Sequence, residues 1–258
     1  MSIEIYLNKT VEQNASLHYE KAKKAKQKRS RVLEAIQHTE QKLQALQKEK
    51  DSVLLDLKKE KKPLRKKEWY EKFHWFYSSE GFLCIGGRDA TSNEIVVKKH
   101  AEKGDVVLHT DMAGSPFFVI KDGENASEQT LNEAAQATAS YSKAWKLGLP
   151  TLDVFYVKPE QVTKKAKPGE FMGKGAFMIY GETKYLHPLL EVAVGIKDGQ
   201  IIGGPVDAVK AHAEKYVLLV PGRDKMSDTA KKIKYLLKAD DLDEITLFIP
   251  PGGCGVKK

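Results

Sequence analysis

Short apolar segments alternate with polar breaks between Phe73 and Lys121. Gly, Asp and Asn residues stand in the breaks, which is typical of a meander of adjacent β-strands. Gly86-Gly87 permits positive φ, so we expect the chain to reverse direction there. The pattern predicts strands at Phe82–Ile85, Glu94–His100, Asp105–Leu108 and Phe117–Ile120.

The N-terminal part of the chain has the pattern of a long helix. Thr10–Lys62 contains neither Gly nor Pro and is dominated by Ala, Lys, Gln, Glu and Leu. A helix of about 50 residues extends roughly 75 Å at 1.5 Å per residue. Pro63 predicts its end, and the alternation in Met1–Leu7 predicts a short strand before it.

Apolar residues within this helix fall on a heptad frame. Such a seam requires a partner helix, which either is missing from this chain or comes from a second copy, so we expect a coiled-coil arm. A solvated helix whose charges keep it soluble is the alternative. The seam positions are Val32, Ile36, Leu43, Leu46, Val53, Leu57 and Leu64.

The rest of the chain alternates strands and helices. Thr130–Glu133 matches a capping box, and Gly148 followed by Pro150 predicts the end of the helix that it opens. Asp198-Gly199 between two apolar segments is a strong hairpin signal. We expect strands at Leu152–Val157, Ala176–Tyr180, Leu190–Ile196, Gln200–Ile202, Tyr216–Val220 and Glu244–Ile249, and helices at Pro205–Glu214 and Asp228–Leu237, the second capped by Ser227 or Asp228.

These elements predict an α+β protein. We expect a long basic coiled-coil helix, followed by a mostly antiparallel sheet domain with covering helices and by a small C-terminal α/β extension. The expected boundaries are 1–15 for a lead-in segment, 16–66 for the coiled-coil helix, 67–186 for the sheet domain and 187–258 for the extension.

Positive charge is concentrated in the helix. The formal net charge of the 258 residues is +8, and Glu20–Glu68 alone holds 17 Lys/Arg and 8 Asp/Glu, a net of +9. The remainder therefore sums to about −1, so the globular part, if it binds RNA, has to do so through local patches. Two cysteines form neither a disulfide framework nor a zinc pattern, and no apolar run is long enough to span a membrane. A reducing, cytoplasmic setting fits best.

The polar breaks hold the candidate nucleic-acid-binding residues. Arg88 at a turn tip, with Asn93 nearby and Lys98-Lys99 on the return strand, is suited to hold a phosphate or a base edge. A turn capped by Arg88–Asp89 or Asn93, with no ligand, is the alternative. The remaining candidates for a polar or phosphate contact are His109, Ser115 and Lys143, and Lys164, Lys165 and Lys174 in a basic, Gly-rich loop that lacks the P-loop spacing.

Two further groups of residues have alternative interpretations. His109 and Asp111 are two apart at a strand end and are able to share a metal or act as an acid/base pair, but no third ligand stands at suggestive spacing, so a polar contact or a loop anchor is preferred. The aromatic residues between Trp69 and Tyr77 stand beside lysines and are suited to stack on unpaired bases. Packing of the junction between arm and sheet is the preferred interpretation, because burial is the commonest use of large rings.

Many separate motifs stand in a fixed order along this chain. They include Trp69-Tyr-Glu-Lys-Phe73, Ser78-Ser79-Glu-Gly-Phe82, Gly86-Gly-Arg-Asp89, Gly104-Asp105, Thr130-Leu-Asn-Glu-Ala134 and Pro168-Gly-Glu170. In these motifs the chain resembles the NFACT family, whose members include eukaryotic NEMF and bacterial RqcH. Residues 3–186 are similar to that family's NFACT-R domain and to the segment that leads into it, and the extension from His187 looks like an archaeal form.

The resemblance implies a ribosome-associated quality control factor. Members bind the large ribosomal subunit that carries a stalled peptidyl-tRNA, contact tRNA and rRNA, and support mRNA-free extension of the nascent chain from alanyl-tRNA. Peptide transfer belongs to the ribosome, so the resemblance implies a binding and positioning factor, not an enzyme, with no cofactor, metal or membrane. The family's amino-terminal domain and first coiled-coil helix do not appear here, so we expect this chain to be the C-terminal half of a larger protein.

Three hypotheses follow. The first is an RNA-binding module of a ribosome rescue factor, whose binding falls steeply with salt. The second is a protein–protein adaptor whose arm recruits a partner. The third is a metal-dependent nuclease or hydrolase that uses His109 and Asp111.

Overall fold

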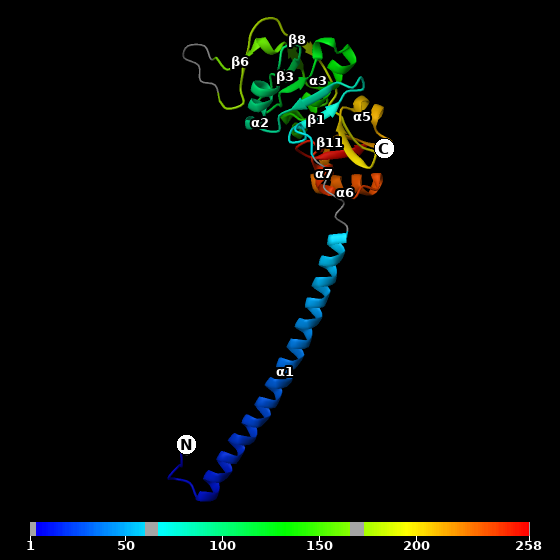
Figure 1. Ribbon diagram of the computed structural model, residues 1–258. Helices are drawn as coiled ribbons and strands as arrows, with labels where there is room; N and C mark the ends of the chain where they lie inside the picture. Colours follow the sequence, from blue (N-terminus) through cyan, green and yellow to red (C-terminus); the bar gives the residue numbers. More distant parts are fainter. Residues whose placement is uncertain (1–3, 60–66, 166–172, 258) are drawn as a thin grey trace. The chain divides into compact units, whose positions relative to one another are not determined.

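The computed structural model describes residues 4–59, 67–165 and 173–257, except the side chains of residues 48, 49 and 51–59. The chain divides into two compact units, Met1–Lys66 and Lys67–Lys258. The first unit is built on one continuous helix, α1 (Val11–Lys59), as Figure 1 shows. Thr10 caps it: the Gln13 N–H donates to Thr10 Oγ1 at 3.3 Å, and the Thr10 N–H donates to Gln13 Oε1 at 3.1 Å. The predicted helix is therefore confirmed, while its predicted end at Pro63 lies outside the described residues.

The lead-in segment is not the predicted strand, because residues 4–7 have no strand partner. A side chain takes the backbone groups instead. The Tyr6 N–H donates to Asn14 Oδ1 at 2.9 Å, and Asn14 Nδ2 donates to the Tyr6 carbonyl at 3.0 Å. Asn14 is buried by this turn, which folds the lead-in back on the start of α1.

The heptad seam of α1 is exposed in the first unit. Val32 and Ile36 are each 48% exposed, and Leu43 and Leu46 are each 58% exposed. The seam positions Val53, Leu57 and Leu64 lie outside the described side chains. The described half of the seam therefore presents an apolar stripe to its surroundings.

A six-stranded antiparallel sheet forms the centre of the second unit. Its order is β1-β2-β4-β3-β5-β8, and every neighbouring pair is antiparallel. This confirms the predicted α+β class with a mostly antiparallel sheet. The strands are β1 (His74–Tyr77), β2 (Leu83–Gly86), β3 (Val106–Thr110), β4 (Phe118–Ile120), β5 (Val154–Val157) and β8 (Lys184–Leu186).

Each face of this sheet has its own core. On one face, Phe73, Val107 and Val119 pack with Val96 beneath α2 (Ala90–Ile95) and the π-helix η1 (Val96–His100). On the other face, Leu108 and Phe118 pack with α3 (Glu128–Ser140) and α4 (Lys143–Leu147). The buried alanines of α3 allow close approach to the sheet, as the thin alanine face predicts.

The C-terminal residues share the second of these cores. A four-stranded antiparallel sheet of order β10-β9-β11-β12 carries three short helices, and Trp145 Nε1 donates across to the Gly253 carbonyl at 3.0 Å. α6 and α7 lie side by side below β11 (Figure 1). The elements are β9 (Val192–Lys197), β10 (Gln200–Gly204), α5 (Val206–His212), β11 (Lys215–Asp224), α6 (Met226–Leu237), α7 (Leu242–Thr246) and β12 (Cys254–Lys257).

The smaller elements complete the second unit. Most predicted strands and helices are present with ends shifted by one or two residues, although β11 runs on to Asp224. At the predicted hairpin, Asp198 and Gly199 both have positive φ, 50° and 74°. The smaller elements are the 3-10 helices η2 (Gly123–Asn125) and η3 (Pro159–Gln161) and the paired strands β6 (Val162–Thr163) and β7 (Met178–Ile179).

The predicted return strand Glu94–His100 was wrong, because this segment forms α2 and η1. A local cap decides the difference. Asp89 Oδ1 accepts from the Ser92 N–H at 2.7 Å, and Ser92 Oγ accepts from the Asp89 N–H at 2.8 Å. Strand β2 therefore pairs with β4 instead of with the segment that directly follows it.

The predicted capping box at Thr130 was also wrong. Ser127 caps α3 by accepting from the Gln129 N–H, and Thr130 instead donates to Ser78 Oγ inside the unit. The single predicted helix is two, because Ser142 caps α4 separately before Gly148 ends it in the left-handed conformation.

Two predictions near the C-terminus were wrong as well. The expected strand Glu244–Ile249 is helix α7 followed by a turn, because Asp241 accepts from the Asp243 and Glu244 N–H groups and starts a helix. Lys225, rather than Ser227 or Asp228, occupies the N-cap of α6, without a side-chain hydrogen bond. Strand β12 has no counterpart among the predictions.

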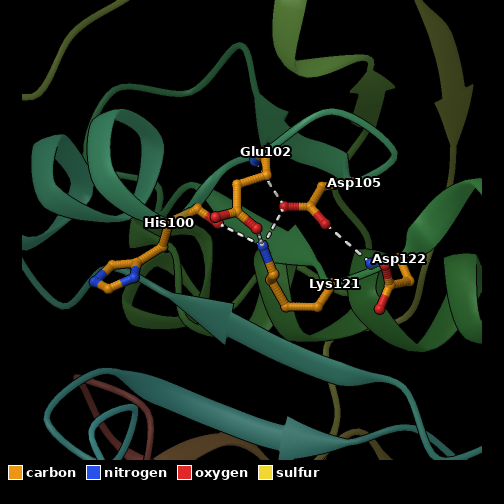
Figure 2. A network of polar contacts seen from close by, with 5 residues as sticks. All are labelled: His100, Glu102, Asp105, Lys121 and Asp122. Atoms are coloured by element: carbon orange, nitrogen blue, oxygen red, sulfur yellow. Dashed lines mark hydrogen bonds and ion pairs between the residues drawn. The ribbon is translucent and has the colours of Figure 1, made fainter.

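A polar network holds the C-terminal end of the π-helix η1 (Figure 2). Lys121 Nζ donates to the His100 carbonyl at 2.9 Å and pairs with Glu102 at 2.9 Å and Asp105 at 2.7 Å. The other oxygen of Asp105 accepts from the Asp122 N–H at 2.9 Å. One cation thus joins the end of η1 to the start of β3 and the end of β4, which holds the backbone at the end of η1 in place.

Candidate nucleic-acid interface

Asn93 joins α2 to the loop that precedes β4. Its Oδ1 accepts from the Phe117 N–H at 3.0 Å, and its Nδ2 donates to the Ser115 carbonyl at 3.2 Å. Gly87 is required beside it, because a Cβ there would lie 2.0 Å from Asn93 Oδ1. The Ser115 hydroxyl is buried and bonds Thr110 and Met112. Asn93 and Ser115 therefore shape this loop from inside.

Arg88 points inward and does not stand at an exposed turn tip. Its Nη2 donates to the Phe73 carbonyl at 3.0 Å, while its Nε is buried without a hydrogen-bond partner among the described residues. Burial lowers the pKa of Arg88, and burial together with the Arg88 charge lowers the pKa of His74 to about 3. The imidazole of His74 is thus neutral at pH 7 and stacks on Tyr141 at 4.1 Å.

His109 supports the same loop by stacking. Its ring lies 3.8 Å from the ring of Phe117 at an interplanar angle of 17°. Burial lowers the pKa of His109 to about 4, so it is uncharged at pH 7. Asp111 is in contact with the Tyr185 hydroxyl at 3.5 Å. Among the described residues, no three His, Cys, Asp or Glu side chains are grouped so that they could hold a metal ion.

Lys164 is tied down rather than free. Its Nζ donates to the carbonyls of Gly173 at 2.9 Å and Ala176 at 3.0 Å and lies 5.1 Å from the centre of the Phe177 ring. Phe177 packs edge-on against Phe117 at 5.2 Å. Lys164 is also 3.9 Å from Glu94. A continuous series of contacts therefore connects His109, through two phenylalanines, to the basic loop.

Exposed cations gather around α2. Lys98 pairs with Glu94 at 2.6 Å on the helix surface, and Lys99 is exposed beside it. Gly175 approaches so closely that a Cβ there would lie 2.7 Å from Ala90, which holds the neighbouring Lys174 near Asp89. Part of the loop, residues 166–172, lies outside the described residues. We call the four exposed lysines the basic edge: Lys98, Lys99, Lys165 and Lys174.

The structure thus divides the predicted site residues into two classes. Arg88, Asn93, His109, Ser115 and Lys164 hold the scaffold together, whereas the basic edge presents ammonium groups at the surface, with Lys98 paired to Glu94. Lys143 is exposed at the start of α4, next to Gly114 of the loop. The sequence analysis missed the supporting role of Phe117 and Phe177, although aromatic residues beside short strands were a signal for it. Ammonium groups on a rigid support are suited to bind phosphates.

Comparison with known proteins shows the family of this chain. Residues 72–181 match the family described as the NFACT protein RNA binding domain. An archaeal Rqc2 homolog, aRqcH, from Methanocaldococcus jannaschii is 42% identical over 207 residues, which are 77% of this chain and 31% of that protein. The chain belongs to the NFACT family. The ribosome quality control complex subunit NEMF from mouse is 38% identical over 181 residues, 68% of this chain and 16% of that protein.

This NFACT chain spans about a third of the archaeal relative's length and less than a fifth of mouse NEMF. One solved structure, the C-terminal part of the fibronectin/fibrinogen-binding protein from Streptococcus suis, aligns over 50% of this chain and 48% of that chain, with a TM-score of 0.40 and 22% identity. No helix in the described part of this NFACT chain is long and apolar enough to cross a membrane.

Proposed function

We propose that this chain is the RNA-binding part of a ribosome-associated quality control factor. It binds the large ribosomal subunit that carries a stalled peptidyl-tRNA, contacts tRNA and rRNA in the cytoplasm, and helps to position alanyl-tRNA for mRNA-independent alanine tailing of the nascent chain. The ribosome carries out peptide transfer, so the chain acts by binding rather than as an enzyme. The observation that supports this most is that the matched RNA-binding domain, residues 72–181, contains the whole basic edge.

The charge distribution supports local contact with phosphates. Because the chain outside Glu20–Glu68 sums to about −1, long-range attraction by the globular part is weak. The four lysines of the basic edge are exposed, and two of them are carried by the π-helix that the Lys121 network holds. Contact with about four phosphates lowers the logarithm of the binding constant by roughly 0.9 per phosphate for each tenfold rise in salt.

Co-sedimentation with large subunits that carry peptidyl-tRNA tests the proposal. Replacing Lys98, Lys99, Lys165 and Lys174 together by Ala should abolish most of the salt-sensitive binding. The matched control replaces four exposed lysines of the C-terminal residues, Lys210, Lys225, Lys231 and Lys238, by Ala, so the loss of charge is equal. Equal binding of the basic-edge variant and the control variant to large subunits would show that the basic edge does not contribute to binding.

A protein–protein adaptor is the second candidate, because the exposed seam of α1 favours it. Val32 and Ile36 are half exposed on a stripe that a partner helix would cover, supplied by a segment outside this chain or by a second copy. Replacing Ile36 by Lys should weaken that association without affecting RNA binding. The mass of the chain in solution measures self-association, and partners that disappear after nuclease treatment would count against a direct adaptor role.

A further inference from the structure

Four aromatic side chains at the start of the second unit form a connected surface. We call Trp69, Tyr70, Trp75 and Tyr77 the aromatic platform. The ring centres of Tyr70 lie 5.6 Å from Trp69, 5.2 Å from Trp75 and 6.1 Å from Tyr77. The hydroxyls of Tyr70 and Tyr77 share a hydrogen bond at 3.2 Å. The rings therefore hold one another at defined angles.

The platform faces outward, although the segment that carries it also supplies the core. Phe73 and Phe76 are buried, whereas Trp69 is 46% exposed and Tyr77 is 40% exposed. Trp75 and Tyr77 stand two apart on β1, so both point to the side opposite Phe76. Tyr70 contacts both exposed rings and, like Trp75, is partly buried and packs on the core, so the platform presents two open rings on a supported base.

His100 provides a flat support for Trp69. The two rings stack with centres 4.5 Å apart at an interplanar angle of 21°. Burial and the charges of Lys72, Lys121 and Lys99 lower the pKa of His100, so the imidazole is neutral at pH 7. The indole is thereby fixed on one side, while its exposed part stays open for a second planar group.

Charge is arranged unevenly around the platform. Lys72 and Lys99 are exposed at its His100 end and act on that imidazole. Burial raises the pKa of Tyr70, together with Tyr77 and with the charges of Glu68 and Glu71. A polyanion with planar groups is therefore guided to place its phosphates at the lysine end and its rings along the platform.

A cavity continues the platform at its far end. Trp75, Phe76 and Tyr77 line a space of about 280 Å³ together with residues of the C-terminal part, which include Ile202, Gly203 and Val209. Exposed Lys197 lies at the same cavity. This volume is near the lower end for ligand pockets, which suits one planar ring rather than a large ligand.

We propose that the aromatic platform binds unpaired bases of single-stranded RNA, with Lys72 and Lys99 on the flanking phosphates and one base in the cavity beside Trp75. Flat supported rings next to cations are the combination by which proteins hold single strands without reading their sequence. The platform rests on the RNA-binding part of the proposed function and adds a preference for unpaired nucleotides.

Fluorescence anisotropy with a labelled ten-nucleotide uridine or adenine strand tests the platform, in parallel with an RNA duplex of the same length. Trp69→Ala should weaken single-strand binding about 5- to 100-fold, because stacking on one ring contributes that much, and should leave duplex binding unchanged. Trp69→Phe should retain most of the affinity. Tyr77→Ala, at an exposed ring outside the core, should also weaken single-strand binding.

Tyr235→Ala is the matched control. Tyr235 is an aromatic residue on α6 that is 84% exposed, between Lys231 and Lys238, so it tests whether any exposed ring near lysines has the same effect. Equal single-strand affinities of the Trp69→Ala, Tyr77→Ala and Tyr235→Ala variants would overturn the platform. The platform would also be overturned if Trp69→Ala weakened duplex binding as much as single-strand binding. A variant with only Lys98, Lys165 and Lys174 replaced by Ala keeps Lys99 and separates the two proposals. Loss of large-subunit binding in this variant, together with normal single-strand binding, would support both proposals. Unchanged single-strand binding by the platform variants, together with the expected loss in this variant, would overturn the platform and leave the proposed function.

Discussion

Asn93→Ala is the change that most directly probes how α2 is held to the sheet. The side chain is 9% exposed and satisfies two backbone groups of the loop before β4, the N–H of Phe117 at 3.0 Å and the carbonyl of Ser115 at 3.2 Å. Both of these residues are buried. Alanine leaves the N–H and the carbonyl without the partners they have in the native protein.

The magnitude follows from the two orphaned groups. Each buried unsatisfied group costs about 1–3 kcal/mol, so the two groups together cost about 2–6 kcal/mol. Water that enters the space left by the amide would reduce this loss. We therefore expect the free energy of unfolding to fall by about 2–4 kcal/mol, in the lower half of the range.

Urea denaturation followed by tryptophan fluorescence measures this change cleanly. The three tryptophans of the chain, Trp69, Trp75 and Trp145, all lie in the second unit, so the signal excludes the long helix that dominates circular dichroism. Lys99→Ala on the neighbouring π-helix is the control and should stay within about 0.5 kcal/mol of the parent. An Asn93→Ala loss below about 0.5 kcal/mol would refute the bridging role.

Two further predictions concern charge. Asp105→Asn should lower the free energy of unfolding by about 2–3 kcal/mol in the same assay, because Lys121 then keeps only Glu102 and the His100 carbonyl as partners. A change no larger than that of Lys99→Ala would contradict the network in Figure 2. Burial lowers the pKa of His109 from 6.5 to about 4, so its contribution is complete above pH 6.5 and is lost as pH falls towards 4. His109→Gln should therefore flatten the acid-side fall in unfolding free energy by up to about 3 kcal/mol, and an unchanged pH profile would refute this.

The sequence predicted best those elements whose conformation depends on residues close to one another in the chain. Helix α1 follows from a long segment without Gly or Pro, and the Asp198-Gly199 turn follows from two residues that tolerate positive φ. The α+β class followed from the order of apolar segments, because the meander between Phe73 and Lys121 is readable as short alternations.

The failures share a physical cause, which is competition between signals of similar strength. Thr130 and Ser127 are both plausible caps, and the choice fell to Ser127 because Ser78, 52 residues away, draws the Thr130 hydroxyl inward. The apolar residues of Glu244–Ile249 suit a strand, but Asp241 starts a helix that packs on α6. The pattern of apolar and polar residues does not show which distant residue each side chain contacts, and that contact decides between the two structures.

The candidate site was predictable by residue type and not by role. Asn93 was recognised as unusual, but its partners are 22 and 24 residues away, so its bridging function required the fold. Arg88 looked like a turn-tip cation, yet the helix that follows it turns its guanidinium towards the Phe73 carbonyl. Of the predicted site residues, the exposed lysines are the ones whose side chains the fold leaves at the surface for contact with RNA.

The salt dependence of tRNA binding tests the central claim most directly. Affinity is measured by anisotropy between about 50 and 200 mM salt for the parent, the basic-edge variant and the control with four lysines replaced in the C-terminal residues. The basic-edge variant should lose roughly 3–4 units from the slope of log affinity against log salt, while the control keeps the parental slope. Identical slopes for the parent and the basic-edge variant would contradict RNA binding through the basic edge.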